Sequence, residues 1–346
     1  MCPSAFVQKE AIKPKKSPPS KIEDILFSRI ENLSGSIGAS PLFIDLRHLP
    51  DSIACSTGEH IWDALSRKGT SVGLTVVPVT GFYGKGSAHQ AMVAEVVRSF
   101  GYGVATRLFR RDLERQSLSK DISTLLKMLK TGVEQADLLI DLELVGEDVH
   151  SISSIIEQIP QVNDWRTLTI IGGSFPLDLR HLKSNGTYEL FRYGFKVWKN
   201  ELRQLMQSLH GRTPSFGDYT IQHPVYREPV TLPHVSASIR YSAPESWIVF
   251  RGEWIGKKNG AGSAQYPAEA QLLMERPEYS GEDFSFGDRF VAEKARSGSD
   301  HPGNAAQWLL AGINHHITLT AETIRTISEP AKATEVAVPV ASAVTK

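Results

Sequence analysis

The sequence predicts an α/β fold of the TIM-barrel-like (β/α)8 type, which can be incomplete at its first βα unit. Segments with strand character alternate with helical segments at a spacing of roughly 30 residues, as in βα units with a parallel sheet. The segment 73–80 is almost entirely apolar, which is typical of a parallel strand buried on both faces. No G-x-G-x-x-G sequence follows the first expected strand, and this disfavours a dinucleotide-binding sheet.

Hydrophobic periodicity places the individual elements along the chain. The expected strands are 41–49, 73–80, 103–109, 136–144 and 167–173, with two more around Tyr219 and Ile239. A weak strand near the N-terminus would complete the set of eight that a closed barrel requires. The expected helices are 21–33, 51–66, 87–100, 118–132, 150–159, 188–209, 267–274, 287–296 and 305–327.

Composition limits the domain organisation and the classes of function. The chain has 346 residues, 41% of them hydrophobic, and a formal net charge of zero. This length is ample for a sizeable core, and we expect one barrel-like domain over 21–328. We expect a flexible basic arm at 1–20 and a disordered tail at 329–346. The balanced charge argues against a protein that coats nucleic acid or membrane through bulk electrostatics.

The N-terminal sequence and the cysteines indicate a cytoplasmic protein. The only cysteines are Cys2 and Cys55, so we expect neither a disulfide nor a cysteine-based metal site. The first residues lack the apolar core of a secretory signal, and no apolar run approaches the ~18 residues of a membrane span. We expect no metal ion, no cofactor and no membrane association.

Charged side chains stand near the carboxyl-terminal ends of several expected strands. Successive side chains of a strand point to opposite faces, so Asp45 and Arg47 are expected on the same face of one strand, and Asp141 and Glu143 on the same face of another. Charges on apolar parallel strands are costly unless they reach a wet cavity or one another. Because barrel active sites lie at this end, we expect a polar pocket there. Its expected ligand-binding residues are Asp45, Arg47, Arg107, Ser174, Tyr219, Arg240, Tyr241 and Arg251, with Asp141, Asp218 and His315 as catalytic candidates.

The histidine pair His315-His316 has two interpretations. Neighbouring residues of a helix point about 100° apart, so the pair is a poor ligand set for one metal ion. No H-E-x-x-H sequence and no carboxylate at ligand spacing accompany it. A capping or packing role is one interpretation. A general base is the other, since the ordinary pKa of histidine lies near neutral pH.

Several fragments in the second half of the chain resemble the phage-associated "beta protein" family. They are GGSFP at 172–176, SFGDYTIQHP at 215–224, SIRYS at 238–242, WIVFRG at 247–252, and FSFGDRF with GINHHIT between 284 and 318. The resemblance spans roughly 41–318 and implies a barrel-like fold and an origin in phage or bacterial genomes. The family name describes no activity, so the resemblance adds to the fold rather than to the function.

Two departures from the family pattern accompany this resemblance. Members open with an additional strand–helix unit that does not occur before Lys21, so the N-terminus is expected to be truncated. Members carry a Glu-Trp pair where this chain has Gly194-Phe195, with Arg192 and Trp198 retained. If that glutamate is catalytic in the family, this copy is impaired.

The arginines of the expected pocket suggest its ligand. A planar guanidinium group binds phosphate or carboxylate through two parallel hydrogen bonds, so Arg47, Arg107, Arg240 and Arg251 would hold an anionic small molecule or a nucleic-acid end. The carboxylates of Asp45, Asp141 and Asp218 would orient these arginines or act as acid/base groups. Hydrolysis or phosphodiester cleavage is the reaction class to test. In the opposing interpretation the charges form structural ion pairs along the rim.

A non-catalytic function is the alternative. The surface of 215–252 would then bind a protein partner in phage infection or phage defence. Convergent charges in a concave pocket favour the anion-binding enzyme, whereas a filled barrel top with an exposed aromatic patch favours the interaction module.

Overall fold

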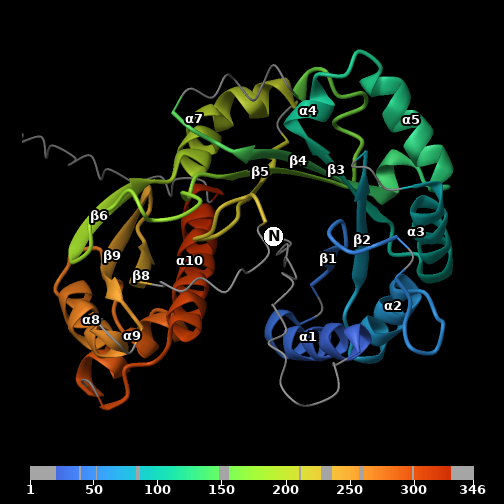
Figure 1. Cartoon of the computed structure of the whole chain (residues 1–346). Helices are drawn as coiled ribbons and strands as arrows, with labels where there is room; N and C mark the ends of the chain where they lie inside the picture. The colour runs from blue at the N-terminus through green and yellow to red at the C-terminus, as the bar shows by residue number, and fades with distance from the viewer. Residues whose placement is uncertain are drawn as a thin grey trace, which may run out of the picture.

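The computed structural model describes residues 21–38, 40–51, 53–82, 86–147, 156–209, 212–226, 236–256, 261–297 and 300–328. The strands described form two sheets (Figure 1). The larger sheet is parallel and curls into a half-barrel. An α/β fold with a parallel sheet is therefore confirmed, whereas a complete barrel is not formed by these strands. In spatial order the sheet contains β1 (Leu42–Asp45), β2 (Val76–Gly81), β3 (Val104–Phe109), β4 (Ala136–Leu144), β5 (Thr167–Gly173) and β7 (Ser215–Gly217).

Alternation along the parallel strands separates two apolar layers. Leu42, Leu108 and Ile140 point to the convex face and belong to the large core beneath the helices. Phe43 and Leu139 point to the concave face and belong to a smaller buried cluster. The helices of the half-barrel lie on its outer side (Figure 1). They are α1 (Ile22–Ile37), α2 (Ile61–Ser71), α3 (Ser87–Phe100), α5 (Leu118–Met128) and α7 (Tyr193–Ser208), with the short α4 (Arg110–Leu113) after β3.

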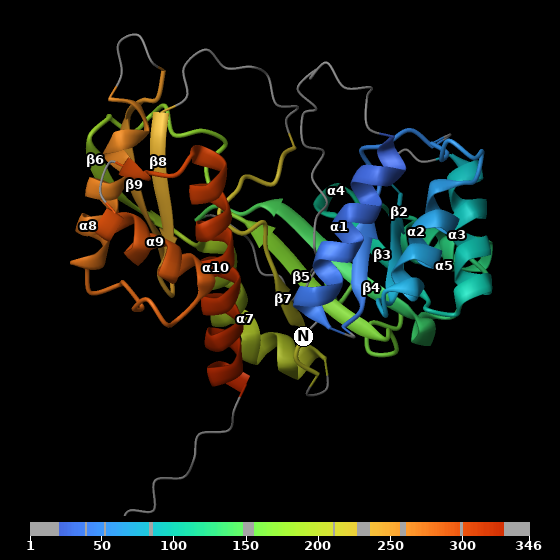
Figure 2. The ribbon, with the colours of Figure 1, turned by 90° about the horizontal axis from the view of Figure 1, so that it is seen from below.

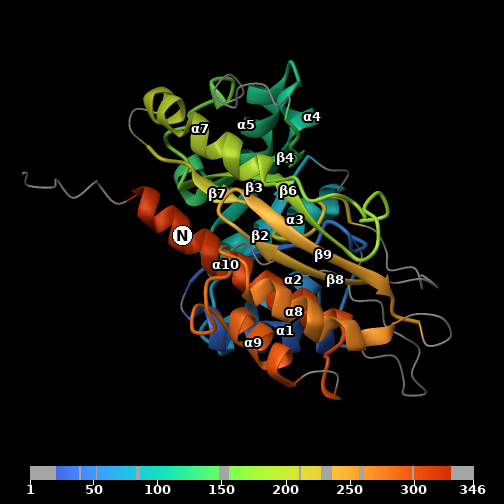
Figure 3. The ribbon, with the colours of Figure 1, turned by 90° about the vertical axis from the view of Figure 1, so that its left-hand side faces the viewer.

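The second sheet is antiparallel and has the order β6-β9-β8. Its strands are β6 (Gly186–Phe191), β8 (Ser236–Ser242) and β9 (Ser246–Trp254). Two helices, α8 (Tyr266–Met274) and α9 (Phe286–Ser297), cover one face, where Ile239, Tyr241 and Phe250 are buried (Figure 3). The last helix, α10 (Ala305–Ser328), packs along β8 and lies between the two sheets (Figure 2).

The strand expected around Tyr219 is shifted to β7, which pairs with β5 in the parallel sheet, and the barrel strand expected around Ile239 is wrong. Tyr219 follows β7 in a turn, and Ile239 belongs to β8 of the antiparallel sheet. The reason lies in the connection between β8 and β9, where the Ala243 N–H donates to the Ser246 carbonyl at 2.8 Å and closes a tight hairpin. Such a connection joins antiparallel strands only.

Two helix boundaries also differ from expectation. The helix expected over 51–66 begins only at Ile61, because a turn closed by the Cys55 N–H and the Glu59 carbonyl precedes it. The imidazole of His60 then accepts from the Trp62 N–H at 3.2 Å and caps the helix. The helix expected from 188 is preceded by β6, and α7 begins at Tyr193. Most of the helix expected over 150–159, the arm 1–20 and the tail 329–346 lie outside the described residues.

Close backbone contacts hold α7 and α10 against the sheets. A Cβ atom at Gly194 would stand 2.4 Å from the Gly172 carbonyl oxygen at the end of β5. A Cβ atom at Gly312 would stand 2.6 Å from the Arg240 carbonyl oxygen on β8. Only glycine permits either approach without a shift of backbone. Among the helices described, none is both long and apolar enough to cross a bilayer.

Candidate functional site

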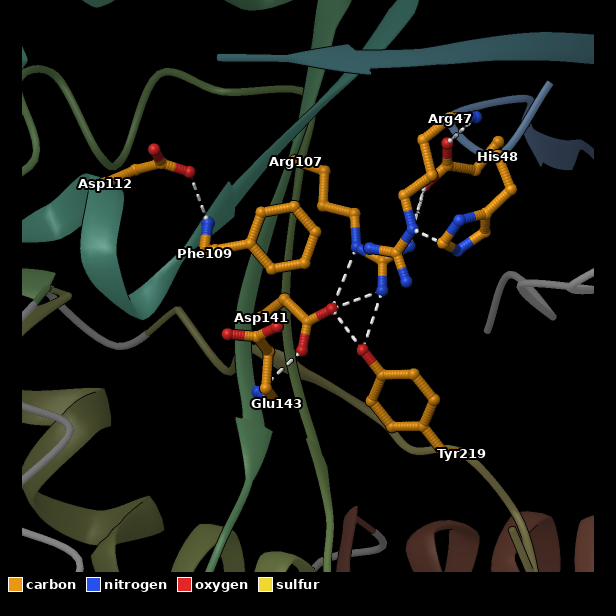
Figure 4. Close-up of polar contacts among 9 residues, drawn as sticks. Arg47, His48, Arg107, Phe109, Asp112, Asp141, Glu143 and Tyr219 are labelled. Carbon is orange, nitrogen blue, oxygen red and sulfur yellow. Dashed lines mark hydrogen bonds and ion pairs between the residues drawn. The ribbon is translucent and has the colours of Figure 1, made fainter. Parts of the chain in front are cut away.

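Arg107 is the centre of a buried polar network on the concave face of the half-barrel (Figure 4). Its side chain is 1% exposed. Its Nε donates to Asp141 Oδ2 at 2.8 Å, its Nη2 donates to the same oxygen, and its Nη1 donates to Asp45 Oδ2 at 2.8 Å. The two carboxylates come from β4 and β1, on either side of β3. Burial opposes the charge of Arg107, but the carboxylates outweigh it and raise the pKa of the guanidinium.

Tyr219 joins this network from the turn that follows β7. Its hydroxyl accepts from Arg107 Nη2 at 2.8 Å and donates to Asp141 Oδ2 at 2.5 Å. Burial and the charge of Asp141 raise the pKa of Tyr219 well above its usual range. The phenol therefore keeps its proton at neutral pH and acts as a hydrogen-bond donor. Four side chains from four segments of the chain, including Asp45, thus share one set of contacts.

Three arginines converge on one aromatic ring at the outer edge of the network. The guanidinium carbons of Arg47, Arg107 and Arg111 lie 5.0, 5.0 and 5.4 Å from the ring centroid of Phe109. Such distances allow a cation–π attraction for each group. Arg47 also donates from Nε to His48 Nε2 at 3.0 Å and lies 3.9 Å from Asp45. We call Arg47, Arg111 and Phe109 the sheet-edge site.

Two local backbone features shape this edge. The Phe109 N–H donates to Asp112 Oδ2 at 2.9 Å, which starts α4 directly after β3 and brings Arg111 back over the ring. At the end of β4 the pairing register shifts after Asp141, and Glu143 has a φ of 56°. The Glu143 N–H donates to Asp141 Oδ1 at 2.8 Å. This bulge breaks the strand alternation, so the expectation that Asp141 and Glu143 share a face from regular pleating does not hold.

A second buried network joins α10 to β8 and to the segment after β7. The Nε2 of His316 lies 2.8 Å from Asp218 Oδ2, and its Nδ1 lies 2.8 Å from Ser242 Oγ. Burial lowers the pKa of His316. The neutral ring then donates from Nε2 to Asp218 and accepts the hydroxyl of Ser242 at Nδ1. Burial opposes ionisation of Asp218, but His316 and Arg192, whose Nη2 lies 3.6 Å away, keep the pKa of that carboxyl below its ordinary value.

The order Ser242, His316, Asp218 resembles the hydrogen-bond chain of a serine hydrolase. Ser242 and His316 are each 1% exposed, so a substrate does not reach the serine hydroxyl in this conformation. These hydrogen bonds instead connect three segments, namely β8, α10 and the segment after β7. The Thr220 N–H donates to Asp218 Oδ1 at 2.9 Å, and Thr220 has a φ of 56°, which turns the backbone sharply after Tyr219.

His315 belongs to a third set of contacts. Its Nδ1 lies 2.9 Å from Asp288 Oδ2 and its Nε2 lies 2.9 Å from the Ser242 carbonyl oxygen. Tyr241 donates to Asp288 Oδ1 at 2.7 Å. Both ring nitrogens of His315 face acceptors and the ring is buried, so this placement does not support a general base at His315. The two histidines bind different partners, in agreement with their angular separation on a helix.

The expectation of one shared ring of charged residues is wrong in part. Asp45, Arg47, Arg107, Asp141 and Tyr219 meet on the concave face. Asp218, Tyr241 and His315 lie in the networks around α10. Ser174 accepts from the Gly194 N–H at 3.4 Å, and Arg240 and Arg251 lie on the antiparallel sheet. The error follows from the strand assignment, because β8 and β9 are not barrel strands.

Sequence reasoning missed several residues of these networks. Phe109 and Arg111 follow Arg107 at the end of β3, and the same strand-end argument that selected Arg107 was sufficient to select them. Arg192, Asp288 and Ser242 lie in or beside the fragments that resemble the family, but no local pattern shows that they join these networks, because their partners come from distant segments. Within the described ranges, no three or more histidine, cysteine or acidic side chains form a group that could hold a metal ion.

Comparison with known proteins adds the family. The model of the family described as "Beta protein" matches residues 1–322. The family expected from the fragments between 172 and 318 is thereby confirmed. No curated protein and no solved structure matches the chain.

Proposed function

The chain belongs to the Beta protein family, and we propose that it binds an anionic, phosphate-bearing ligand at the sheet-edge site. The observation that carries this proposal is the convergence of the Arg47, Arg107 and Arg111 guanidinium groups on the Phe109 ring. Parallel α/β sheets place ligands at the carboxyl-terminal ends of their strands, which is where these groups stand.

The arginines of this edge have different roles in the proposal. Arg107 uses Nε, Nη1 and Nη2 on Asp141, Asp45 and Tyr219, so it positions the edge rather than the ligand. Arg47 uses only its Nε in a hydrogen bond, to His48, and within the described residues its Nη1 and Nη2 have no hydrogen-bond partner. Arg111 is exposed and makes only the ring contact there. Arg47 and Arg111 therefore keep the N–H donors that a phosphate group would accept.

Hydrolysis or phosphodiester cleavage is the reaction class that this site would support. Tyr219 stays protonated, and its hydroxyl, which donates to Asp141 and accepts from Arg107, would hold both groups in place beside the reacting phosphate. His48 is exposed beside Arg47, and imidazole is the side chain best suited to exchange protons near neutral pH. In this proposal Asp141 and Asp45 hold the arginine network and do not react.

A thermal denaturation screen tests the binding proposal. Wild type would be heated with inorganic phosphate, nucleotides and a short oligonucleotide, beside Arg47→Gln and the double variant Arg47→Gln/Arg111→Gln. The control is Arg98→Gln, which removes the same charge from an exposed arginine on α3 paired with Glu95. We expect one of these anions to raise the Tm of wild type and of the control, and to raise the Tm of the double variant less. An unchanged response in the double variant would refute the sheet-edge site.

The thermal screen, together with a turnover assay, distinguishes the enzyme from the non-catalytic alternative, a protein-interaction module in phage infection or defence. The turnover assay measures phosphodiester cleavage as the release of nitrophenol from bis(4-nitrophenyl) phosphate. Turnover by wild type that falls in Tyr219→Phe and in Arg47→Gln supports an enzyme. Stabilisation by an anion without turnover leaves a binding protein, and no response in either assay favours the interaction module.

A further inference from the structure

We infer that Arg240 and Arg251 form a second anion-binding site, on the face of the antiparallel sheet that is turned away from α8 and α9. Strand register places the two residues together. Arg240 pairs with Val249 on β9, and Arg251 pairs with Ser238 on β8. Paired residues share a face, and so do residues two apart on one strand, so the two arginines are diagonal neighbours on one face. This site is independent of the sheet-edge site.

Neither arginine has a carboxylate partner among the residues that the structure describes. Arg240 donates from Nη1 to the Ile221 carbonyl at 2.9 Å, and its guanidinium carbon lies 4.7 Å from the Phe175 ring centroid. Burial lowers the pKa of Arg240 to about 10, which reflects a cation without an adjacent anion. Within the described ranges Arg251 makes no hydrogen bond or ion pair, and its Nε is buried without a partner there.

The surroundings of the two groups are apolar. Phe175, Ile221 and Val249 belong to one buried cluster on this face. A carboxylate does occur on the same face, at Glu253, two residues beyond Arg251 on β9. Its Oε1 accepts from Asn185 Nδ2 at 2.7 Å, and it makes no ion pair with Arg251. Within the described residues, the protein therefore leaves two cations on one face of the sheet without a carboxylate partner, while Glu253 on the same face binds Asn185.

Such an arrangement is unfavourable unless a ligand completes it. A half-buried cation loses hydration without gaining a partner. An anion bound by the two groups would remove this cost, and the apolar surroundings would strengthen its attraction to them. A buried donor without a partner, such as Arg251 Nε, is a common mark of a functional position.

The donors that remain define the ligand class. Each guanidinium carries five N–H groups, and Arg240 uses one of them on Ile221. Two guanidinium forks from diagonal positions, about 7–8 Å apart at Cα, suit a group with several charged oxygens that can accept from both sides. The chemical class is a dianionic phosphate, as in a phosphate monoester.

Thermal denaturation with inorganic phosphate, compared with chloride at the same ionic strength, tests this site. The variants are Arg251→Gln and Arg240→Gln, with Arg47→Gln to report on the sheet-edge site and Arg98→Gln as the charge-matched control. Because Arg251 has no partner to lose among the described residues, Arg251→Gln without phosphate should have the Tm of wild type or a higher one. Saturating phosphate should raise the Tm of wild type by about 3 °C or more. Arg251→Gln should lose about half of that gain or more, as expected when a site stops contributing to ligand-linked stability.

The outcomes separate the two sites. A phosphate response in Arg251→Gln and Arg240→Gln equal to that of wild type overturns the second site, whatever Arg47→Gln does. A response lost only in Arg47→Gln supports the sheet-edge site alone. The absence of any phosphate-specific effect on wild type overturns the second site as well. Arg240→Gln could be less stable through the lost contact with Ile221, and for that reason the change in Tm on adding phosphate is compared, not the Tm itself.

Discussion

Replacement of Arg107 by glutamine should destabilise the protein by about 3–5 kcal/mol, the usual cost of removing one partner from a buried ion pair. Asp141 is 0% exposed and Asp45 is 6% exposed, and both direct Oδ2 at the guanidinium. Glutamine offers two N–H donors at one end of a shorter side chain and carries no charge. It cannot serve both carboxylates, so at least one negative charge is left buried without compensation. This prediction depends on the burial of the network rather than on the number of its contacts.

Urea denaturation followed by tryptophan fluorescence measures the effect. With an m value of about 3 kcal/mol per M, the midpoint should fall by about 1–1.7 M while m stays constant. Arg115→Gln is the matched control, because Arg115 forms a comparable pair with Asp121 at the surface, and it should cost less than about 1 kcal/mol. The double variant Arg107→Met/Asp141→Leu should recover part of the loss, since it removes cation and anion together. A midpoint for Arg107→Gln within about 0.2 M of the control, with m unchanged, would refute the reasoning.

Three further predictions concern α10 and the concave network. The pKa of His316 in the folded protein lies below its ordinary value of about 6.5, so below that pH the unfolded chain binds a proton that the folded chain does not bind. The free energy of unfolding should therefore fall by up to about 1.4 kcal/mol per pH unit as the pH decreases. His316→Gln should flatten this slope in urea denaturation between pH 5 and 7.5, and an equal slope in both proteins would contradict the assignment. Gly312→Ala should lower the Tm by several degrees because its Cβ meets the Arg240 carbonyl oxygen, whereas Gly35→Ala on α1, with nothing within 4 Å, should raise the Tm slightly in the same calorimeter. Tyr219→Phe should cost about 1–3 kcal/mol in urea denaturation because it removes a buried hydroxyl from Asp141 and Arg107, and a loss no larger than that of a surface variant would show that the hydroxyl is not needed there.

The half-barrel was accessible from sequence because its strands are nearly all apolar and regularly spaced. For the same reason Asp45, Arg107 and Asp141 could be selected as a group. Each is a charged residue on an otherwise apolar strand, and parallel strands bring their carboxyl-terminal ends to one edge of the sheet. Tyr219 joined them for a different reason than expected, since it comes from a turn and not from a barrel strand.

The antiparallel sheet was missed because an alternating pattern was read as a continuation of the barrel. In β8 the polar Ser238 and Arg240 alternate with the buried Ile239 and Tyr241, which is the pattern of a half-exposed antiparallel strand. The networks around α10 depend on contacts between residues far apart in sequence, such as His316 with Asp218. No local pattern encodes such a contact, and only the packing of α10 against β8 brings the partners together.

Asp218 and Tyr219 are consecutive residues whose side chains enter different networks. Asp218 reaches His316 on the last helix, while Tyr219 reaches Arg107 inside the half-barrel. These two adjacent residues therefore link α10 to the concave face of the parallel sheet. A displacement of α10 would therefore shift the Tyr219 phenol beside the arginines, and a rearrangement of those arginines would shift Asp218 and His316. The positions of the two parts of the molecule are in this sense coupled through one dipeptide.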